Sequence, residues 1–142
     1  MLKGKEIVVG VTGGIAAYKG AEFVRLLAKK EANVHVVMTR NAREFVTPLT
    51  FQTLSGNPVT TDPFVLVDGE KIGHIALADL AELIVILPAT ANIIGKIATG
   101  IADDFLSTVV MASKAPVLFV PSMNVNMWES QALQKNMETL VD

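Results

Sequence analysis

Four short apolar runs, each joined to the next by segments with helical character, constrain the fold of this chain most strongly. The runs are residues 7–12, 34–38, 83–87 and 117–120. A short apolar run bounded by turn residues is typical of a buried strand. Strands that alternate with helices along the chain pack as a parallel sheet covered on both faces. The sequence therefore predicts an α/β fold with a doubly wound parallel sheet.

The segments between the strands carry the spacing and end signals of helices. Apolar residues three and four apart predict a first helix from Ile15 to about Lys30. Gly100 is expected to end a helix, and Asp103 or Asp104 to cap the next one. Pro88 is expected to end the third strand, and residues 59–73 to form an irregular connection with a short strand. Further helices are predicted at residues 41–45, 47–54, 76–81, 92–99, 105–112 and 129–141.

Size and composition bound the class of protein. A chain of 142 residues has the length of one domain, and 51% of its residues are apolar. No apolar run reaches the roughly 18 residues of a membrane span. The apolar excess indicates a sheet covered on both faces and surface buried between subunits, so we expect a homo-oligomer. The net charge is −2 with scattered basic residues, which argues against nucleic acid or an anionic membrane as partner and favours a small molecule.

The absence of cysteine excludes several kinds of chemistry within these residues. No disulfide, thiolate metal site or cysteine nucleophile can form. The two histidines lack metal-ligand spacing, so we expect no metal, and His35 is interpreted as a structural residue without a useful partner. The first residues do not resemble a secretory signal, and we therefore expect a cytoplasmic location.

A glycine turn and two polar strand ends predict a ligand site. Gly13 and Gly14 lie between the first strand and the first helix, where backbone N–H groups can receive a phosphate. The spacing matches neither the dinucleotide fingerprint nor a P-loop, and a tight turn is the alternative. Thr39, Thr90 and Asn92 follow the next two strands and should converge with Gly13, although each alone is more often a helix cap.

Residues 121–128 follow the fourth strand and contain two amide side chains and the only tryptophan. In open α/β sheets, ligands bind just beyond the carboxyl ends of strands. The Asn124 amide can hydrogen-bond a carboxylate without bringing a charge, while Met123, Met127 and Trp128 exclude water. An ordinary turn beside core residues is the alternative. His74 is an isolated titratable residue, for which a structural role is the commoner interpretation.

Five segments together resemble the flavin-containing cysteine decarboxylase family: residues 10–19, 73–75, 88–92, 100–108 and 121–128. The resemblance implies a flavodoxin-like three-layer sandwich that binds FMN. It also implies a homo-oligomer, a trimer or a multiple of trimers. The FMN contacts that it implies are Gly13, Gly14, Ile15, Thr39, Phe45, Thr90, Ala91, Asn92 and Ser122.

The same resemblance implies an activity. FMN oxidises a cysteinyl thiol, and the adjacent carboxylate then leaves as carbon dioxide. The implied reaction converts 4'-phosphopantothenoylcysteine to 4'-phosphopantetheine in coenzyme A biosynthesis. His74 is the implied catalytic residue, and Asn124 and Met123 the implied substrate contacts. The alternatives are a peptidyl-cysteine decarboxylase of lantibiotic maturation, a non-catalytic flavin-binding regulatory protein and a flavin prenyltransferase.

One departure from the family's pattern affects the expected domain organisation. The family uses a cysteine on a downstream segment that covers the substrate, and this chain has no cysteine. We therefore expect residues 1–142 to form a single flavin-binding decarboxylase domain without that segment. A natural protein that continues into a fused ligase domain would account for the difference.

Overall fold

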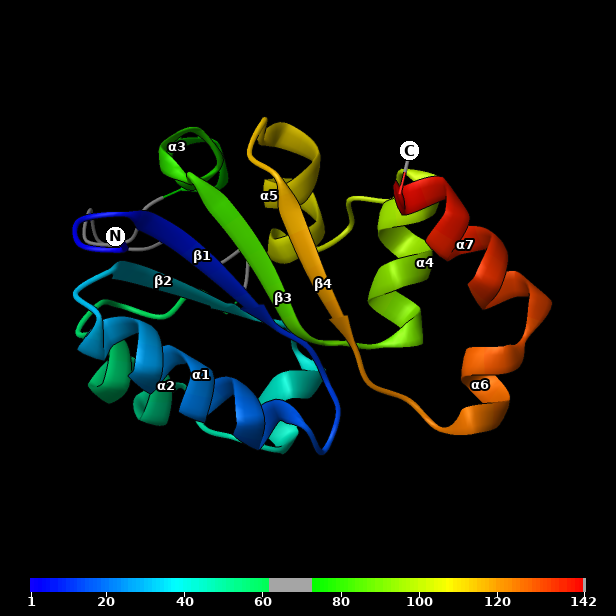
Figure 1. Ribbon diagram of the computed structural model, residues 1–142, viewed down its shortest axis with the longest axis horizontal. Helices are drawn as coiled ribbons and strands as arrows, with labels where there is room; N and C mark the ends of the chain where they lie inside the picture. The colour runs from blue at the N-terminus through cyan, green and yellow to red at the C-terminus, as the bar shows by residue number, and fades with distance from the viewer. Residues whose placement is uncertain (62–72, 142) are drawn as a thin grey trace.

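A parallel sheet forms the centre of the molecule in the computed structural model, which describes residues 1–61 and 73–141 (Figure 1). In the described part of the chain its strands pair in the order β2-β1-β3-β4, all parallel. This order confirms the predicted doubly wound α/β fold and is the flavodoxin-like arrangement. The strands are β1 (Glu6–Val11), β2 (Asn33–Met38), β3 (Leu83–Ala89) and β4 (Val117–Pro121).

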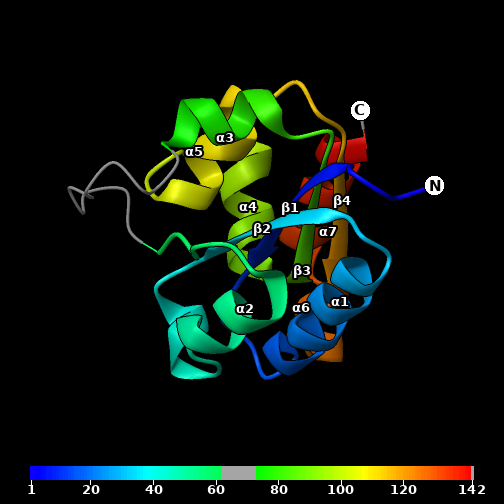
Figure 2. The ribbon, with the colours of Figure 1, turned by 90° about the vertical axis from the view of Figure 1, so that its left-hand side faces the viewer.

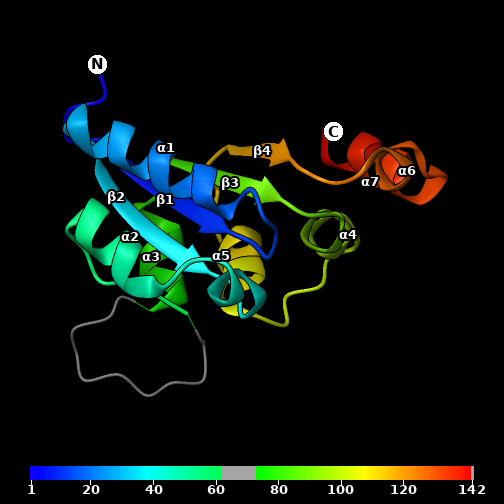
Figure 3. The same cartoon turned by 90° about the horizontal axis from the view of Figure 1, so that it is seen from below.

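Helices cover both faces of the sheet, which gives three layers. In Figures 1 and 2, α1 and α2 lie on one face and α3 and α5 on the other, whereas α4, α6 and α7 lie toward the carboxyl end of β4. Figure 3 shows the twist of the sheet between these layers. The helices are α1 (Ala17–Lys29), the 3-10 helix η1 (Asn41–Glu44), α2 (Pro48–Ser55), α3 (His74–Leu80), α4 (Ala91–Thr99), α5 (Phe105–Ala112), α6 (Val125–Glu129) and α7 (Gln131–Val141).

Alternate residues of β1 enter two different cores, as the period of a strand requires. Val9 packs in the core beneath α1 and α2, whereas Val8 packs in the core beneath α3 and α5. Gly10 lies on the face covered by α3 and α5, where an added Cβ would lie 2.6 Å from the Cδ1 atom of Leu106. The glycine thus lets α5 approach the sheet closely.

The end signals of several helices act as predicted. Thr47 caps α2 with Pro48 in the first turn, and Gly100 ends α4 in the left-handed conformation. Asp104 caps α5 in a capping box with Ser107. Gly100 has a φ of 79°, which a side chain tolerates poorly.

Several element ends differ from the prediction by one or more residues. β3 continues past Pro88 to Ala89, because its pairing with β4 shifts between Ile86 and Ala89, and proline is tolerated where a ladder is interrupted. The predicted last helix, residues 129–141, begins two residues later as α7, and the short helix α6 that precedes it was not predicted. Ser130 lies between the two helices, and its hydroxyl donates to the Met127 carbonyl oxygen and accepts the Leu133 N–H. A cap of this kind begins a new helix.

The expectation that β4 is a buried strand was wrong for one of its faces. Leu118 is 52% exposed and Val120 37% exposed, because β4 is the edge strand of the described sheet and no helix of the described chain covers this face. The expected short strand in residues 59–73 is seen only as a bridge between Thr60 and Val37, and residues 62–72 lie outside the described part. No helix in the described residues is long and apolar enough to cross a membrane.

The interpretation of His35 as lacking a partner was also wrong. Its Nε2 atom lies 2.8 Å from the Oε2 atom of Glu6 on the neighbouring strand. Asn33 donates to the same carboxylate. Burial raises the pKa of Glu6, but the hydrogen bonds from Asn33 and His35 outweigh it and leave that pKa below its ordinary value. This network lies at the amino ends of β1 and β2, away from the carboxyl edge of the sheet.

Candidate cofactor site

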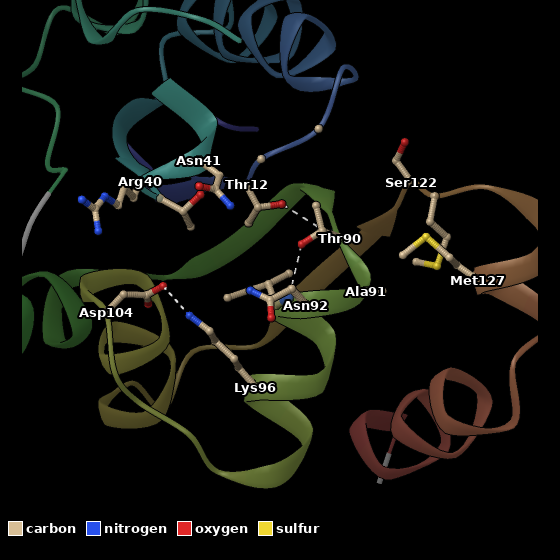
Figure 4. A pocket seen from close by; sticks show the side chains of 15 residues that line it. Thr12, Arg40, Asn41, Thr90, Ala91, Asn92, Lys96, Asp104, Ser122 and Met127 are labelled. Atoms are coloured by element: carbon tan, nitrogen blue, oxygen red, sulfur yellow. Dashed lines mark hydrogen bonds and ion pairs between the residues drawn. The ribbon is translucent and has the colours of Figure 1, made fainter. Parts of the chain in front are cut away.

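A cavity of about 480 Å³ lies at the carboxyl edge of the sheet, between the segments that follow β1 and β3 (Figure 4). This is the point where the strand order reverses, because β1 leads to β2 on one side and β3 to β4 on the other. Open α/β sheets bind their ligands at such a point. The cavity is lined by Thr12, Gly13, Gly14, Thr39, Arg40, Asn41, Thr90, Ala91, Asn92, Ile93, Lys96, Asp104, Ser122, Met123 and Met127.

The turn between β1 and α1 forms one wall and offers backbone donors. Within the described chain, the N–H groups of Gly13, Ile15 and Ala16 donate to no protein acceptor. Gly13 is required by packing, since an added Cβ would lie 2.4 Å from the Cβ atom of Asn41. Free N–H groups beside the start of a 13-residue helix favour an anionic ligand group.

The start of α4 forms the opposite wall. Thr90 caps this helix, because its hydroxyl accepts the Ile93 N–H at 3.3 Å. The cap leaves the N–H groups of Ala91 and Asn92 without a protein acceptor in the described residues. Thr90 therefore fills both roles that the sequence allowed, as a helix cap and as part of a cavity wall. Two helix N-termini thus meet at one cavity, and both favour ligand groups that accept hydrogen bonds.

A cluster of charges closes one end of the cavity. The Nζ atom of Lys96 lies 2.9 Å from the Oδ1 atom of Asp103 and 3.1 Å from the Oδ2 atom of Asp104. Burial lowers the pKa of Lys96, but these two carboxylates outweigh burial and raise it. Burial raises the pKa of Asp104, but hydrogen bonds from Ser107 and from Lys96 outweigh burial and lower it. Both groups therefore remain charged at neutral pH.

The other end of the cavity is less polar. Met123 and Met127 line it together with Ser122, whose N–H donates to the Ala89 carbonyl oxygen at 3.1 Å. Figure 4 shows Ser122 and Met127 across the cavity from the charged cluster. Thioether side chains adapt to flat apolar surfaces. The cavity thus joins an apolar end to walls rich in hydrogen-bond donors.

The predicted site residues fall into two groups. Seven predicted FMN contacts line this cavity, as does the predicted substrate contact Met123, whereas Ile15 and Phe45 do not line it and are 74% and 48% exposed. The seven are Gly13, Gly14, Thr39, Thr90, Ala91, Asn92 and Ser122.

The predicted catalytic residue His74 and the predicted substrate contact Asn124 lie apart in the described chain. His74 begins α3 and packs edge-on against Phe105, with 6.2 Å between the ring centroids. Asn124 follows β4 and lines a neighbouring groove with Ala91 and Met127. His74 lines neither this groove nor the cofactor cavity. Their roles stay predictions.

Several lining residues were not predicted from the sequence, among them Thr12, Arg40, Asn41, Lys96 and Asp104. Lys96 lies four residues after Asn92, which places both on one face of α4, and this spacing was an available signal. Thr12 directly precedes the glycine turn. The cavity position of Asp104 depends on the approach of α5, which no local pattern indicates.

The fold and this cavity define an α/β protein that binds a cofactor with an anionic group and a partly apolar body. A flavin nucleotide has both features, and the donor-rich walls and the methionines fit them. The chain belongs to the flavoprotein family, whose description matches residues 1–142. The family match supports a flavin cofactor.

Known relatives align with nearly the whole of this chain. It is 46% identical over 140 residues to the coenzyme A biosynthesis bifunctional protein CoaBC of Vibrio cholerae, covering 99% of this chain and 35% of that protein. It is 49% identical over 142 residues to CoaBC of Haemophilus influenzae, covering 98% and 35%. The chain thus spans about a third of the length of these relatives.

Solved structures are similar over most of their length. The FMN-dependent cysteine decarboxylase SpaF superposes with a TM-score of 0.90 at 34% identity, covering 99% of this chain and 81% of that chain. A PPC decarboxylase mutant complexed with pantothenoylaminoethenethiol superposes with a TM-score of 0.82 at 26% identity, covering 98% and 78%.

Proposed function

We propose that this chain binds FMN and decarboxylates 4'-phosphopantothenoylcysteine to 4'-phosphopantetheine in coenzyme A biosynthesis. The observation that carries the proposal is the 46–49% identity to bifunctional coenzyme A biosynthesis proteins over nearly the whole chain. SpaF, which is an FMN-dependent cysteine decarboxylase, is 34% identical. The higher identity favours the coenzyme A reaction over decarboxylation of a peptide. The description of these relatives as bifunctional supports the predicted fused ligase domain.

In this proposal, the chain's own residues bind and orient the reactants. Bound flavin supplies a two-electron acceptor for the cysteinyl thiol. The walls at Gly13, Gly14 and Thr90 hold the cofactor, and Met123 and Met127 exclude water beside it. A dry surrounding favours loss of the carboxylate, because a charge leaves the substrate on the way to the transition state.

Asn124 is oriented to donate to a carboxylate. Its Oδ1 atom accepts the Met127 N–H at 2.9 Å and caps α6. The Nδ2 group has no acceptor in the described residues and is available to the substrate carboxylate. The Asn124→Asp substitution therefore tests the amide donor alone, because aspartate can still cap α6 but replaces the donor with a negative charge.

We infer that His74 holds and moves the thiol proton. Its T-shaped contact with Phe105 orients the imidazole. Because His74 lines neither the cofactor cavity nor the groove at Asn124, the proposal includes an oligomer of trimeric symmetry in which neighbouring subunits complete the site. The exposed face of β4 and the 51% apolar composition support such an assembly.

The test uses the purified natural protein with 4'-phosphopantothenoylcysteine, and a peptide with a C-terminal cysteine as the competing substrate. We expect bound flavin and a product lighter by carbon dioxide from the first substrate. Turnover of the peptide alone would favour the peptidyl-cysteine alternative. Flavin without turnover of either substrate would favour a regulatory protein, and absence of flavin and of carbon dioxide would refute the enzyme.

His74→Asn and Asn124→Asp test the two residue roles. We expect both variants to retain FMN and to lose decarboxylation, because neither residue lines the cofactor cavity. The bound flavin is measured by absorbance and the product by mass. Loss of flavin from both variants would assign these residues to the structure instead.

A further inference from the structure

Thr12 is a buried polar residue at the edge of the cofactor cavity. It follows β1 directly and is only 2% exposed. Its hydroxyl donates to the Pro88 carbonyl oxygen and accepts the Thr90 N–H at 3.3 Å. Figure 4 shows Thr12 and Thr90 joined across the base of the cavity. One side chain thus links the segment after β1 to the segment that joins β3 to α4.

This link continues the sheet where its backbone pairing ends. The paired residues of β1 and β3 stop at Gly10 and Ile86. In the described chain, no backbone hydrogen bond joins residues 12–16 to residues 88–92, which form the two walls of the cavity. The Thr12 hydroxyl is therefore the hydrogen-bonded connection between these walls in the described structure.

The link acts on the two helix starts that face the cofactor. Thr12 precedes the free N–H groups of the glycine turn, and it holds the N–H of Thr90, the residue that caps α4. The spacing between the two sets of donors thus depends on one hydroxyl. We propose that Thr12 is a positioning residue that sets the width of the flavin cavity. This inference rests on the proposed flavin binding.

Removal of the hydroxyl would act on the cavity more than on the fold. The Pro88 carbonyl oxygen and the Thr90 N–H would both lose a buried partner, and such groups turn toward water or another partner. The two cores do not depend on the hydroxyl, because β1 remains paired with β2 and β3. The walls are then free to change their spacing while the sheet persists.

The test compares three variants of the natural protein. Thr12→Val has nearly the same shape without the hydroxyl, and Thr12→Ser retains the hydroxyl. Thr99→Val removes a threonine hydroxyl that bonds Gly95 at the exposed end of α4 and is the matched control. FMN affinity is measured by quenching of FMN fluorescence, the flavin environment by visible circular dichroism, and the apoprotein by thermal unfolding.

We expect Thr12→Val to weaken FMN binding by about tenfold or more, as loss of a buried hydrogen-bond partner predicts, and to change the visible circular dichroism of bound FMN. Thr12→Ser should bind within about threefold of the unaltered protein, since its hydroxyl can make the same two bonds. Thr99→Val should bind FMN as the unaltered protein does. If Thr12→Val does not fold, Thr12→Ala is measured in the same way.

Two results would overturn the proposal. Unchanged FMN affinity and dichroism in Thr12→Val, with only a lower melting temperature, would show that the hydroxyl serves the fold alone. An equal loss in Thr12→Ser and Thr12→Val would show that the hydroxyl is not the group that matters. Failure of the unaltered protein to bind FMN is a different pattern, which refutes the proposed function and with it this inference.

Discussion

Asp104 combines three contacts that fix its charge beside the cavity. Its Oδ1 atom accepts the Ser107 N–H at 2.7 Å and the Ser107 hydroxyl at 2.6 Å, and its Oδ2 atom pairs with Lys96. Asp103 pairs with the same lysine but caps no helix, and its side chain is 62% exposed. Substitutions at these two neighbouring residues can therefore distinguish the stabilisation by a helix cap from that by an exposed ion pair.

We expect Asp104→Ala to lower the free energy of unfolding by about 1 kcal/mol, the usual value of an N-cap. Asp103→Ala is the matched control and should change it by no more than about 0.5 kcal/mol. Urea unfolding of the apoprotein at neutral pH measures both. Equal losses in the two variants would contradict the capping role.

The contribution of Asp104 to the free energy of unfolding should also depend on pH, and it should decrease toward acid. Its pKa in the folded protein lies below the ordinary value of 3.8. The stabilisation is therefore complete above the unfolded pKa and is lost as the pH falls through the lower, folded pKa. We expect the difference between the unaltered protein and Asp104→Ala to shrink between about pH 5 and about pH 3. A difference that grows toward acid would contradict this assignment.

We expect glycine to be needed at positions 13 and 14 for different reasons: packing against the protein at Gly13, and room for the cofactor at Gly14. A Cβ on Gly13 would lie 2.4 Å from Asn41, whereas one on Gly14 would meet only Thr90 and Pro88, at 3.8 and 3.9 Å. We expect Gly13→Ala to destabilise the apoprotein by about 1–3 kcal/mol through overpacking. Gly14→Ala should leave apoprotein stability nearly unchanged but weaken FMN binding by about tenfold, because the new methyl group enters the cavity.

Urea unfolding and FMN titration of both variants measure these effects. Unchanged flavin binding in Gly14→Ala would mean that the cofactor does not approach this turn. An apoprotein of normal stability in Gly13→Ala would mean that η1 moves away from the turn at little cost.

The site residues that could be predicted one by one from the sequence are those that carry a local signal. The glycine turn and Thr90 follow strands, and strand ends converge in a parallel sheet. Lys96 and Asp104 were missed because their pairing requires α4 and α5 to lie side by side. Thr12 was missed because its hydroxyl bonds a segment that begins 76 residues later. No local pattern encodes a contact of that range.

At the scale of the element, two glycines affect α4 in opposite ways, one inside the helix and one at its C-cap. Gly95 lies in the middle of the helix, where a Cβ would meet only the Nδ2 atom of Asn136 at 3.5 Å. Gly100 ends the helix at a φ of 79°. We expect Gly95→Ala to raise the free energy of unfolding by up to about 1 kcal/mol, because alanine favours a helix interior.

Gly100→Ala should lower the free energy of unfolding by about 1 kcal/mol, because alanine is strained in the left-handed conformation. Thermal and urea unfolding of the two single variants measure these changes in the free energy of unfolding. Destabilisation by both substitutions would mean that Gly95 is required for the packing of α4 against α7.

The boundaries of the elements show which signals are reliable. Helix α5 matches its predicted range of residues 105–112, because a cap and a following apolar segment mark its start. The end of β3 was misplaced because proline is excluded only from an intact ladder, and the interruption beside Pro88 arises from pairing with β4. Helix α7 begins at Gln131 instead of residue 129, because the Ser130 hydroxyl caps it, and serine is also found on helix surfaces.

At the scale of the whole molecule, the order of the strands places the cavity. In the order β2-β1-β3-β4, β1 and β3 are neighbours from which the chain leads to opposite sides of the sheet, and the cavity lies between the segments that follow them. The alternation of strands and helices predicted the fold class. It did not predict that one face of β4 is open, because exposure of an apolar strand depends on which segments lie beside it.

The separation of His74 and Asn124 leads to a prediction about the assembly. His74 lies against α5, whereas Asn124 lies beyond β4 and lines a groove that His74 does not line. If both act on one substrate, we expect different subunits to supply them. Gel filtration of the natural protein at micromolar concentration should therefore show an oligomer, and a monomer would contradict this arrangement.

Mixed oligomers test the arrangement directly. His74→Asn and Asn124→Asp should each be inactive alone, whereas co-expression of the two variants with different tags should restore part of the activity. Some interfaces then combine an intact His74 from one subunit with an intact Asn124 from its neighbour. The doubly substituted chain co-expressed with either single variant is the matched control and should remain inactive, because no interface then has both residues. Absence of activity in mixed oligomers isolated through both tags would place His74 and Asn124 of one site in the same subunit.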